Sequence, residues 1–186
     1  SKPPAKRVVL INMPRKPRRK HNEAIYHIMS RSISEVLLYQ DNEDKDYYIG
    51  LLKRYTEKFQ CSVYAYSLMN NHVHLHLDPK GYDISKFMHS LNTAYVCYYN
   101  KKYNRCGHLF QGRFESRILD TNAYNIAVSA YIHKNAKDIE GYFGKEETYK
   151  YSSYGIYLGI TEDYHELVDM SFIMALFNIT DSQIFA

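Results

Sequence analysis

Three histidines alternate with apolar residues in one short segment of the chain. His72, His74 and His76 are each separated by one aliphatic residue within residues 72–77. Because successive side chains of a β-strand point to opposite faces, all three imidazoles would share one face and the aliphatic side chains the other. Two imidazoles two residues apart can bind one divalent ion without bending the backbone. The spacing therefore predicts a metal site, and the alternative is a polar strand face without metal.

The other residues near this segment indicate which ion it would bind. No cysteine and no HxxxH pattern lies close to it in the sequence, so a zinc site has little support. An ion held by two imidazoles and one oxygen ligand, with open coordination positions, suits Mg²⁺ or Mn²⁺ acting on phosphate. The predicted cofactor is therefore Mg²⁺ or Mn²⁺.

One of the twenty tyrosines has neighbours suited to catalysis. In the helical pattern of residues 122–135, Tyr131 and Asn135 lie one turn apart and share a face. His133 and Lys134 are adjacent to them. Packing in the core is the ordinary role of a tyrosine in a helix, and residue types alone do not separate Tyr131 from the other tyrosines.

The periodicities predict an alternation of strands and helices that would position these groups. Strands are expected at residues 26–30, 62–68, 72–77 and 114–119, and helices at 41–59, 83–103 and 120–137. The order β-α-β-β-α-β is typical of an α+β, ferredoxin-like (RRM-like) split βαβ fold. It predicts a four-stranded antiparallel sheet with helices on one face, followed by a C-terminal helix that carries Tyr131.

The chain divides into three parts by composition. Residues 1–20 form a basic arm that we expect to be flexible, and residues 1–12 precede Met13, which reads as a natural start, so they are interpreted as an appended or upstream extension. Residues 21–137 hold the predicted core. Residues 138–186 are interpreted as a peripheral extension, with helical spacing over residues 166–177.

The net charge of +4 comes from the arm, which has eight Lys/Arg and no acidic residue. The other residues carry sixteen basic and twenty acidic groups, so affinity for nucleic acid must depend on the arm and on local patches such as residues 101–117. The candidate DNA-binding residues are Arg15, Lys16, Arg18, Arg19, Lys20, Lys101, Lys102, Arg105, His108, Arg113 and Arg117.

Composition also argues against several classes of protein. No apolar run approaches the roughly 18 residues that span a bilayer, so no membrane partner is expected. The three cysteines are odd in number and form no CxxC, which is typical of reduced thiols in the cytosol. A cytoplasmic, nucleoid-associated protein is expected.

Three motifs occur in order along the chain: MNNHVHL at residues 69–75, GHLFQGRF at 107–114 and AYIHKN at 130–135. Together they resemble the single-tyrosine transposases of the HUH superfamily, both insertion-sequence enzymes and REP-associated relatives. The resemblance covers about residues 22–160.

The resemblance implies a role for each motif residue. His72 and His74 would be the metal-binding pair, Asn135 the third ligand and Tyr131 the nucleophile. His76 and Lys134 would be accessory neighbours. Two departures bear on the third ligand: it is Gln in some members, so the shorter Asn135 has further to reach, and many relatives have Pro at the position of Ala136.

The implied activity is cleavage and rejoining of single-stranded DNA beside a hairpin, through a 5′-phosphotyrosine intermediate. Family members occur as homodimers that exchange the tyrosine helix and as monomers that use their own. Two rival functions stay open at this point. One is a non-catalytic or domesticated protein that binds hairpins or single-stranded nucleic acid through an RRM-like sheet. The other is a metallohydrolase that uses water as its nucleophile.

Overall fold

The computed structural model describes residues 24–33 and 36–177 of the 186-residue chain. The basic arm, with Arg15, Lys16, Arg18, Arg19 and Lys20, lies outside the described residues. The strands are β1 (Ile25–Arg31), β2 (Ser62–Met69), β3 (His72–Asp78) and β4 (Glu115–Leu119). The main helices are α1 (Asn42–Phe59), α2 (Ile84–Lys102) and α3 (Asn122–Lys134). Short helices follow: η1 (Asn135–Asp138), η2 (Glu146–Thr148), α4 (Tyr154–Tyr157) and α5 (Ser171–Leu176).

The predicted order and fold class are confirmed. The four strands form one antiparallel sheet in the order β2-β3-β1-β4, as a split βαβ arrangement requires. Side-chain caps begin two of the helices: Asp41 accepts from the Asp44 amide and Thr121 from the Tyr124 amide. The helix expected to reach residue 137 instead ends at Lys134 and continues as the 3₁₀ turn η1.

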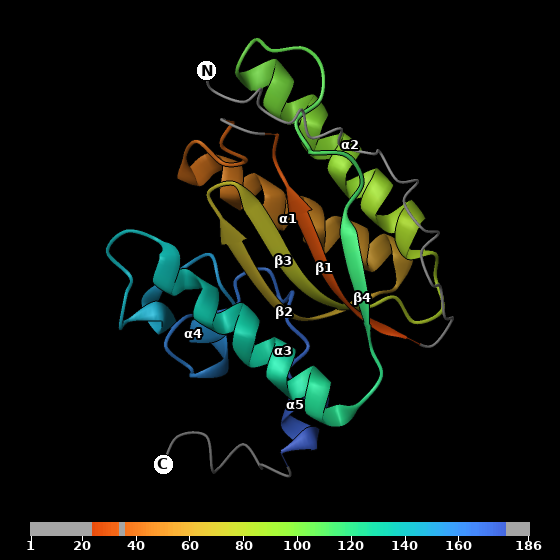
Figure 1. Ribbon diagram of the computed structural model, residues 1–186, viewed down its shortest axis with the longest axis vertical. Helices are drawn as coiled ribbons and strands as arrows, with labels where there is room; N and C mark the ends of the chain where they lie inside the picture. Colours follow the sequence, from red (N-terminus) through yellow and green to blue (C-terminus); the bar gives the residue numbers. More distant parts are fainter. Residues whose placement is uncertain (1–23, 34–35, 178–186) are drawn as a thin grey trace, which may run out of the picture.

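The sheet is covered on both faces (Figure 1). On one face, α1 and α2 bury the main core, to which β3 contributes Val73, Leu75 and Leu77. On the other face, α3 packs over a smaller apolar cluster of Ala65, Leu119, Val128 and Ile132. The histidines of β3 therefore lie between the sheet and α3.

The C-terminal segment lies along β2 and contributes to the core. Isolated β-bridges pair Ser152 with Ser67 and Val168 with Val63. The side chains of Tyr149, Tyr151 and Leu167 join the main apolar cluster. The helix expected over residues 166–177 is shorter than predicted, Ser171–Leu176. The left-handed backbone of Glu166 (φ 47°) interrupts it, and the Asp163 carboxylate accepts from the Val168 amide instead.

This segment also holds α3 in place. The Oγ atom of Ser153, which is fully buried, accepts from the Tyr66 amide at 2.9 Å and lies 2.9 Å from Nε2 of His133 on α3. The His133 ring stacks on Tyr154 with 5.2 Å between ring centroids. One serine thus connects β2, α3 and the C-terminal segment.

We expect Ser153→Ala to lower the free energy of unfolding by about 1–3 kcal/mol, because a buried amide and a buried imidazole would be left without their partner. Urea denaturation measures this change. Ser90→Ala is the matched control, because the Ser90 hydroxyl on α2 makes no hydrogen bond with the residues that the structure describes. Equal stability of the two variants would contradict the connecting role of Ser153.

No helix among the described residues is long and apolar enough to cross a membrane. The three cysteines, Cys61, Cys97 and Cys106, are free.

Candidate active site

α3 runs antiparallel to β3. The start of the helix therefore lies beside His76, its last turns beside His74, and the turn that follows it near His72. The side chain of Asn125 is hydrogen-bonded to His76, and the ring centroids of Tyr131 and His74 lie 5.5 Å apart. Desolvation lowers the pKa of His72, and the negative charge of Asp138, beyond the end of α3, opposes that shift. The expected alignment of the three imidazoles on one face is therefore observed, with α3 as its cover.

His76 has a structural role. It is fully buried, and its Nε2–H donates to Oδ1 of Asn125 at 2.9 Å. The amide orientation of Asn125 is fixed, since its Nδ2 donates to the Thr121 carbonyl at 2.9 Å. His76 thus joins β3 to the first turn of α3.

In His72 and His74 the nitrogen without a hydrogen bond is Nε2, whereas in His76 it is Nδ1, which is fully buried. Nδ1 of His72 lies 2.6 Å from Oδ1 of Asn71, and Nδ1 of His74 lies 2.9 Å from Nε2 of His27. The Nε2 atoms of His72 and His74 make no hydrogen bond within the described part of the chain. Their ring centroids lie 4.9 Å apart at an interplanar angle of 87°.

Asn135 also has a side-chain oxygen that makes no hydrogen bond with the described residues. Its Nδ2 donates to the Tyr131 carbonyl at 2.9 Å, which leaves Oδ1 without a hydrogen bond from any residue between 24–33 or 36–177. Two imidazole nitrogens and one amide oxygen are a donor set that could hold a divalent metal ion. No group of three or more His, Cys, Asp or Glu side chains that could hold a metal is found among the described residues.

Tyr131 is the exposed aromatic of the site. Its side chain is 52% exposed, and its ring packs edge-on against His74 and against His27, the latter at 5.8 Å. A pocket of about 540 Å³ opens beside it between α3 and the sheet. The pocket is lined by His27, Met29, His74, Glu115, Ser116, Arg117, Tyr124, Ala127, Val128 and Tyr131.

Burial keeps the histidines beneath α3 neutral. Desolvation, with smaller effects from His72, His27 and Arg31, lowers the pKa of His74 to about 3. Desolvation, with a smaller effect from Arg117, lowers the pKa of His27 to about 4. Desolvation also lowers the pKa of His76 and of His133 to about 4, and lowers that of His72. Neutral imidazoles are the form that binds metal.

These shifts predict that acid destabilises the protein. In the unfolded chain the histidines titrate near 6.5, whereas His27, His74, His76 and His133 titrate at about 3 to 4 when folded. The contribution of these four histidines to the free energy of unfolding is complete above pH 6.5 and is lost as the pH falls from 6.5 toward 4. At pH 5 we expect a loss on the order of 1–2 kcal/mol for each histidine.

Urea denaturation of the metal-free protein between pH 7.5 and pH 5 measures this loss. His89→Gln, which removes an exposed histidine of α2, should keep the same pH dependence. A free energy of unfolding that does not change over this range would contradict the burial of neutral imidazoles.

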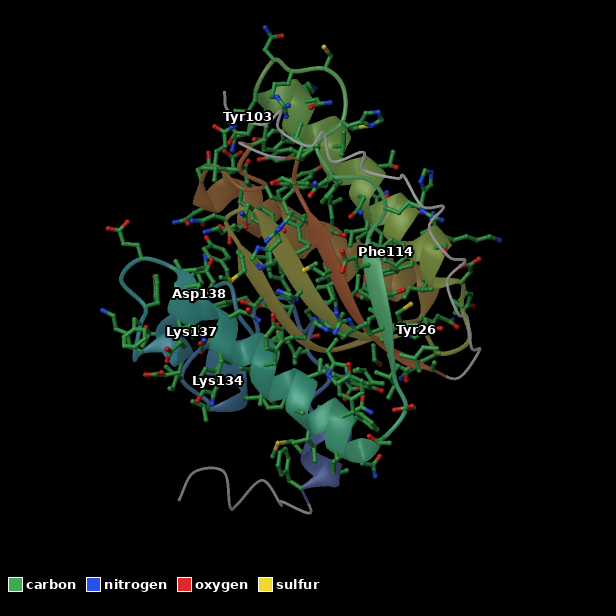
Figure 2. The ribbon with its side chains drawn as sticks, viewed as in Figure 1. Tyr26, Tyr103, Phe114, Lys134, Lys137 and Asp138 are labelled. Carbon is green, nitrogen blue, oxygen red and sulfur yellow. The ribbon has the colours of Figure 1, made fainter. Side chains whose placement is uncertain are left out.

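The structure separates the candidate DNA-binding residues into groups. Arg117 lines the pocket beside Tyr131, and Arg113 and His108 are exposed in the loop before β4. Lys101 is exposed at the end of α2, and the Arg105 guanidinium lies over the Tyr99 ring at 5.6 Å. Lys134 is exposed at the C-terminal end of α3, near Lys137 and Asp138 (Figure 2).

Lys102 is engaged by acidic side chains. Its ammonium lies 2.8 Å from Asp41, 3.0 Å from Glu43 and 2.9 Å from Asp44, whose side chain is fully buried. Desolvation opposes the charge, but the hydrogen bonds to Asp41, Asp44 and Glu43 outweigh it and raise the pKa of Lys102. The surroundings of Lys102 therefore do not support the expectation that it binds DNA. Lys102 instead joins the end of α2 to the start of α1.

Two basic groups near the site were not singled out from the sequence. His27 on β1 is paired in register with His76 and Arg117, and exposed Arg31 with His72. In addition to desolvation, the positive charge of Arg31 lowers the pKa of His72 and His74. The alternation of apolar and polar residues in β1 could have placed His27 on a polar face, but not beside His74, because that pairing spans 47 residues.

Comparisons with known proteins agree with this arrangement. Residues 20–135, which include both histidines, Tyr131 and Asn135, match the family model "Transposase IS200 like". No curated protein matches the chain significantly. Among solved structures, a REP-associated tyrosine transposase bound to a REP hairpin is similar over 81% of this chain and 89% of its own, with 12% identity and a TM-score of 0.65.

A second solved structure, from Deinococcus radiodurans R1 and assigned to the transposases, has 17% identity and a TM-score of 0.45. It covers 65% of this chain and 97% of its own. At these identities, only the first structure supports the shared fold. The family match covers more than half of the chain and includes the histidine strand and the tyrosine helix. The chain therefore belongs to the IS200-like transposases, the single-tyrosine HUH enzymes that its sequence motifs resemble.

Proposed function

We propose that this transposase cleaves and rejoins single-stranded DNA through a covalent bond to Tyr131, with Mg²⁺ or Mn²⁺ held by His72, His74 and Asn135. The observation that carries the proposal is the contact between the exposed Tyr131 ring and the ring of His74. A nucleophile must be reachable by DNA and close to the group that binds the phosphate. The enzyme would act on DNA in the cytoplasm.

The covalent step forms one bond and breaks one. The Tyr131 hydroxyl oxygen attacks the scissile phosphorus, and the bond from phosphorus to the 3′-oxygen breaks. The phenol proton passes to solvent, which reaches the exposed side chain, and the leaving 3′-oxygen takes up a proton. The product is a 5′-phosphotyrosine with a free 3′-hydroxyl. Attack on this phosphotyrosine by the 3′-hydroxyl of another strand reverses the step and joins the strands.

A bound Mg²⁺ or Mn²⁺ would supply charge neutralisation for the non-bridging phosphate oxygens. The chain contributes two neutral imidazoles with free Nε2 atoms and the free amide oxygen of Asn135. His76 is not included in this set, because its Nε2 is bonded to Asn125 and its Nδ1 is fully buried. Lys134 is exposed and is available to phosphate at the same end of α3.

The expected substrate is a hairpin flanked by single-stranded DNA. The similar REP-associated transposase was solved bound to a REP hairpin, which supports a substrate of this class for the present enzyme. Arg117, which lines the pocket beside Tyr131, is the candidate to bind phosphates there, and Lys101, Arg105, His108 and Arg113 are candidates for flanking DNA.

We further propose that Tyr131 acts in its own chain. The Tyr131 ring already contacts His74 of the same chain, and the His133–Ser153 contact holds α3 on the body two residues further along. A homodimer that exchanges α3 alone would have to break this contact, because Ser153 is bonded to Tyr66 of β2.

The experiment that tests the proposed function uses an oligonucleotide with a hairpin and single-stranded flanks, labelled at either end. In Mn²⁺, the protein should cleave a flank and leave the 5′ end of the downstream product attached to protein and the 3′ end of the upstream product free. Cleavage without a covalent adduct would indicate a water-dependent metallohydrolase, and binding without cleavage a domesticated protein.

Arg117 and Lys102 should respond differently to substitution. We expect Arg117→Ala to weaken single-strand binding and to lower the slope of log affinity against log salt by about 0.7 for each phosphate that the variant no longer binds. Lys102→Ala should instead lower the free energy of unfolding by roughly 2 kcal/mol or more, because buried Asp44 is left without its cation. Fluorescence anisotropy and urea denaturation measure the two effects, and the opposite pattern would contradict these assignments.

A further inference from the structure

We infer that His27 is a positioning residue that holds His74 in the tautomer whose Nε2 is free to bind the metal. The inference rests on the proposed function, since the metal ligand is His74. Its basis is a contact between two strands: His27 on β1 and His74 on β3 both face α3, and their nearest nitrogens lie 2.9 Å apart.

The geometry of the two rings is that of a hydrogen bond between ring edges. The rings are inclined by only 24°, and their centroids lie 5.1 Å apart. Nitrogens much closer than the centroids, in nearly coplanar rings, place the N–H of one ring in line with the lone pair of the other. His27 therefore holds both the position and the orientation of the His74 ring.

The direction of this hydrogen bond decides what His74 can do. A neutral imidazole has one N–H and one lone pair. If His74 donates through Nδ1, its Nε2 carries a lone pair and can bind metal. If His74 accepts at Nδ1, its Nε2 carries the proton and cannot bind metal.

The surroundings of His74 favour donation from Nδ1. A proton on Nδ1 of His74 has an acceptor within the protein, Nε2 of His27, whereas a proton on Nε2 would have none among the described residues. If Nδ1 of His74 donates to Nε2 of His27, the proton of His74 has an acceptor. The proton of His27 is then on Nδ1 of His27. His27 is only partly buried, so its second nitrogen does not face the same constraint.

His72 has a similar arrangement from a different source. Its Nδ1 lies 2.6 Å from Oδ1 of Asn71, an atom that can only accept, so Nδ1 of His72 is the donor. Both proposed imidazole ligands thus present Nε2, one because of the preceding residue and one because of a neighbouring strand. Metal-binding histidines characteristically have such an acceptor on the second nitrogen.

The test uses protein with ¹⁵N-labelled histidine and compares His27→Gln, whose side-chain oxygen can accept, with His27→Phe, which fills the space without an acceptor. In metal-free wild type at pH 7.5, long-range ¹H–¹⁵N spectra should show His74 protonated on Nδ1 alone. His27→Phe should lose this single tautomer, and His27→Gln should keep it. His89→Phe on α2 is the matched control.

Titration with Mn²⁺, followed by the electron paramagnetic resonance of the free ion, gives the second readout. We expect His27→Phe to bind Mn²⁺ about 10- to 100-fold more weakly and His27→Gln to stay within about 3-fold of wild type. Protonation of His74 on Nε2 in wild type would overturn the inference. So would a His27→Phe variant with unchanged tautomer and unchanged affinity.

Failure of the proposed metal site would look different. In that case wild type and His72→Ala would bind Mn²⁺ equally weakly, while the tautomer of His74 in the metal-free protein would still show whether His27 sets it. If His27→Phe does not fold, the wild-type tautomer and the His27→Gln titration decide.

Discussion

Tyr131→Phe is expected to abolish both the covalent adduct and DNA cleavage, with the cleavage rate lowered by roughly four orders of magnitude or more. The substitution removes only the hydroxyl that would form the bond to phosphorus. The ring stays, and with it the edge contacts to His27 and His74. The measurement is single-turnover cleavage of the hairpin oligonucleotide in Mn²⁺.

Stability and binding should be unaffected by this change. The Tyr131 side chain is 52% exposed, so we expect the free energy of unfolding to change by no more than about 0.5 kcal/mol. Tyr164→Phe, at a side chain that is 78% exposed, is the matched control and should cleave like wild type. Cleavage by Tyr131→Phe at near the wild-type rate would exclude Tyr131 as the nucleophile.

The second large effect is expected at the histidine pair. His72→Ala and His74→Ala should each lower the cleavage rate by roughly 10³-fold, because charge neutralisation by a bound ion contributes several kcal/mol to phosphate chemistry. Each variant should also bind Mn²⁺ more weakly. His72→Ala is the cleaner of the two, since His72 is only partly buried and its removal leaves a smaller cavity than removal of His74.

His76 provides the contrast within the same strand. It is fully buried and bonded to Asn125, so His76→Ala should destabilise the protein while the affinity of the folded protein for Mn²⁺ stays close to that of wild type. His89→Ala should change neither property. An Mn²⁺ affinity that falls equally in all three strand variants would contradict the separation of His76 from the metal pair.

The parts of the fold that could be predicted from the sequence depend on local patterns. Alternation placed β3 and its three histidines, and apolar periodicity placed α1, α2 and α3. The helix expected from residue 166 fails for a local reason as well, the left-handed conformation of Glu166, which helical spacing does not reveal.

The parts that could not be predicted depend on contacts between distant residues. Lys102 looks like a surface cation in sequence, but its partner Asp44 comes from another helix 58 residues away. His27 has no neighbour in sequence that marks it, and becomes informative only when β1 pairs with β3. Both cases need tertiary structure, because charge and hydrogen-bond partners are set by packing.

The choice among the tyrosines shows the same limit. Tyr48, Tyr95 and Tyr99 are fully buried and serve the core. Among the described tyrosines with exposed side chains, Tyr131 is the one whose ring contacts a histidine. The sequence offered its spacing to Asn135 and the family resemblance, and the structure adds its contact with the histidine face.

The most direct test is to identify the residue bonded to DNA. The protein is incubated with the hairpin oligonucleotide and Mn²⁺, digested with protease and nuclease, and analysed by mass spectrometry. We predict a nucleotide attached through its 5′-phosphate to the peptide that contains Tyr131. A nucleotide on any other residue, or cleaved DNA with no modified peptide, would contradict Tyr131 as the nucleophile.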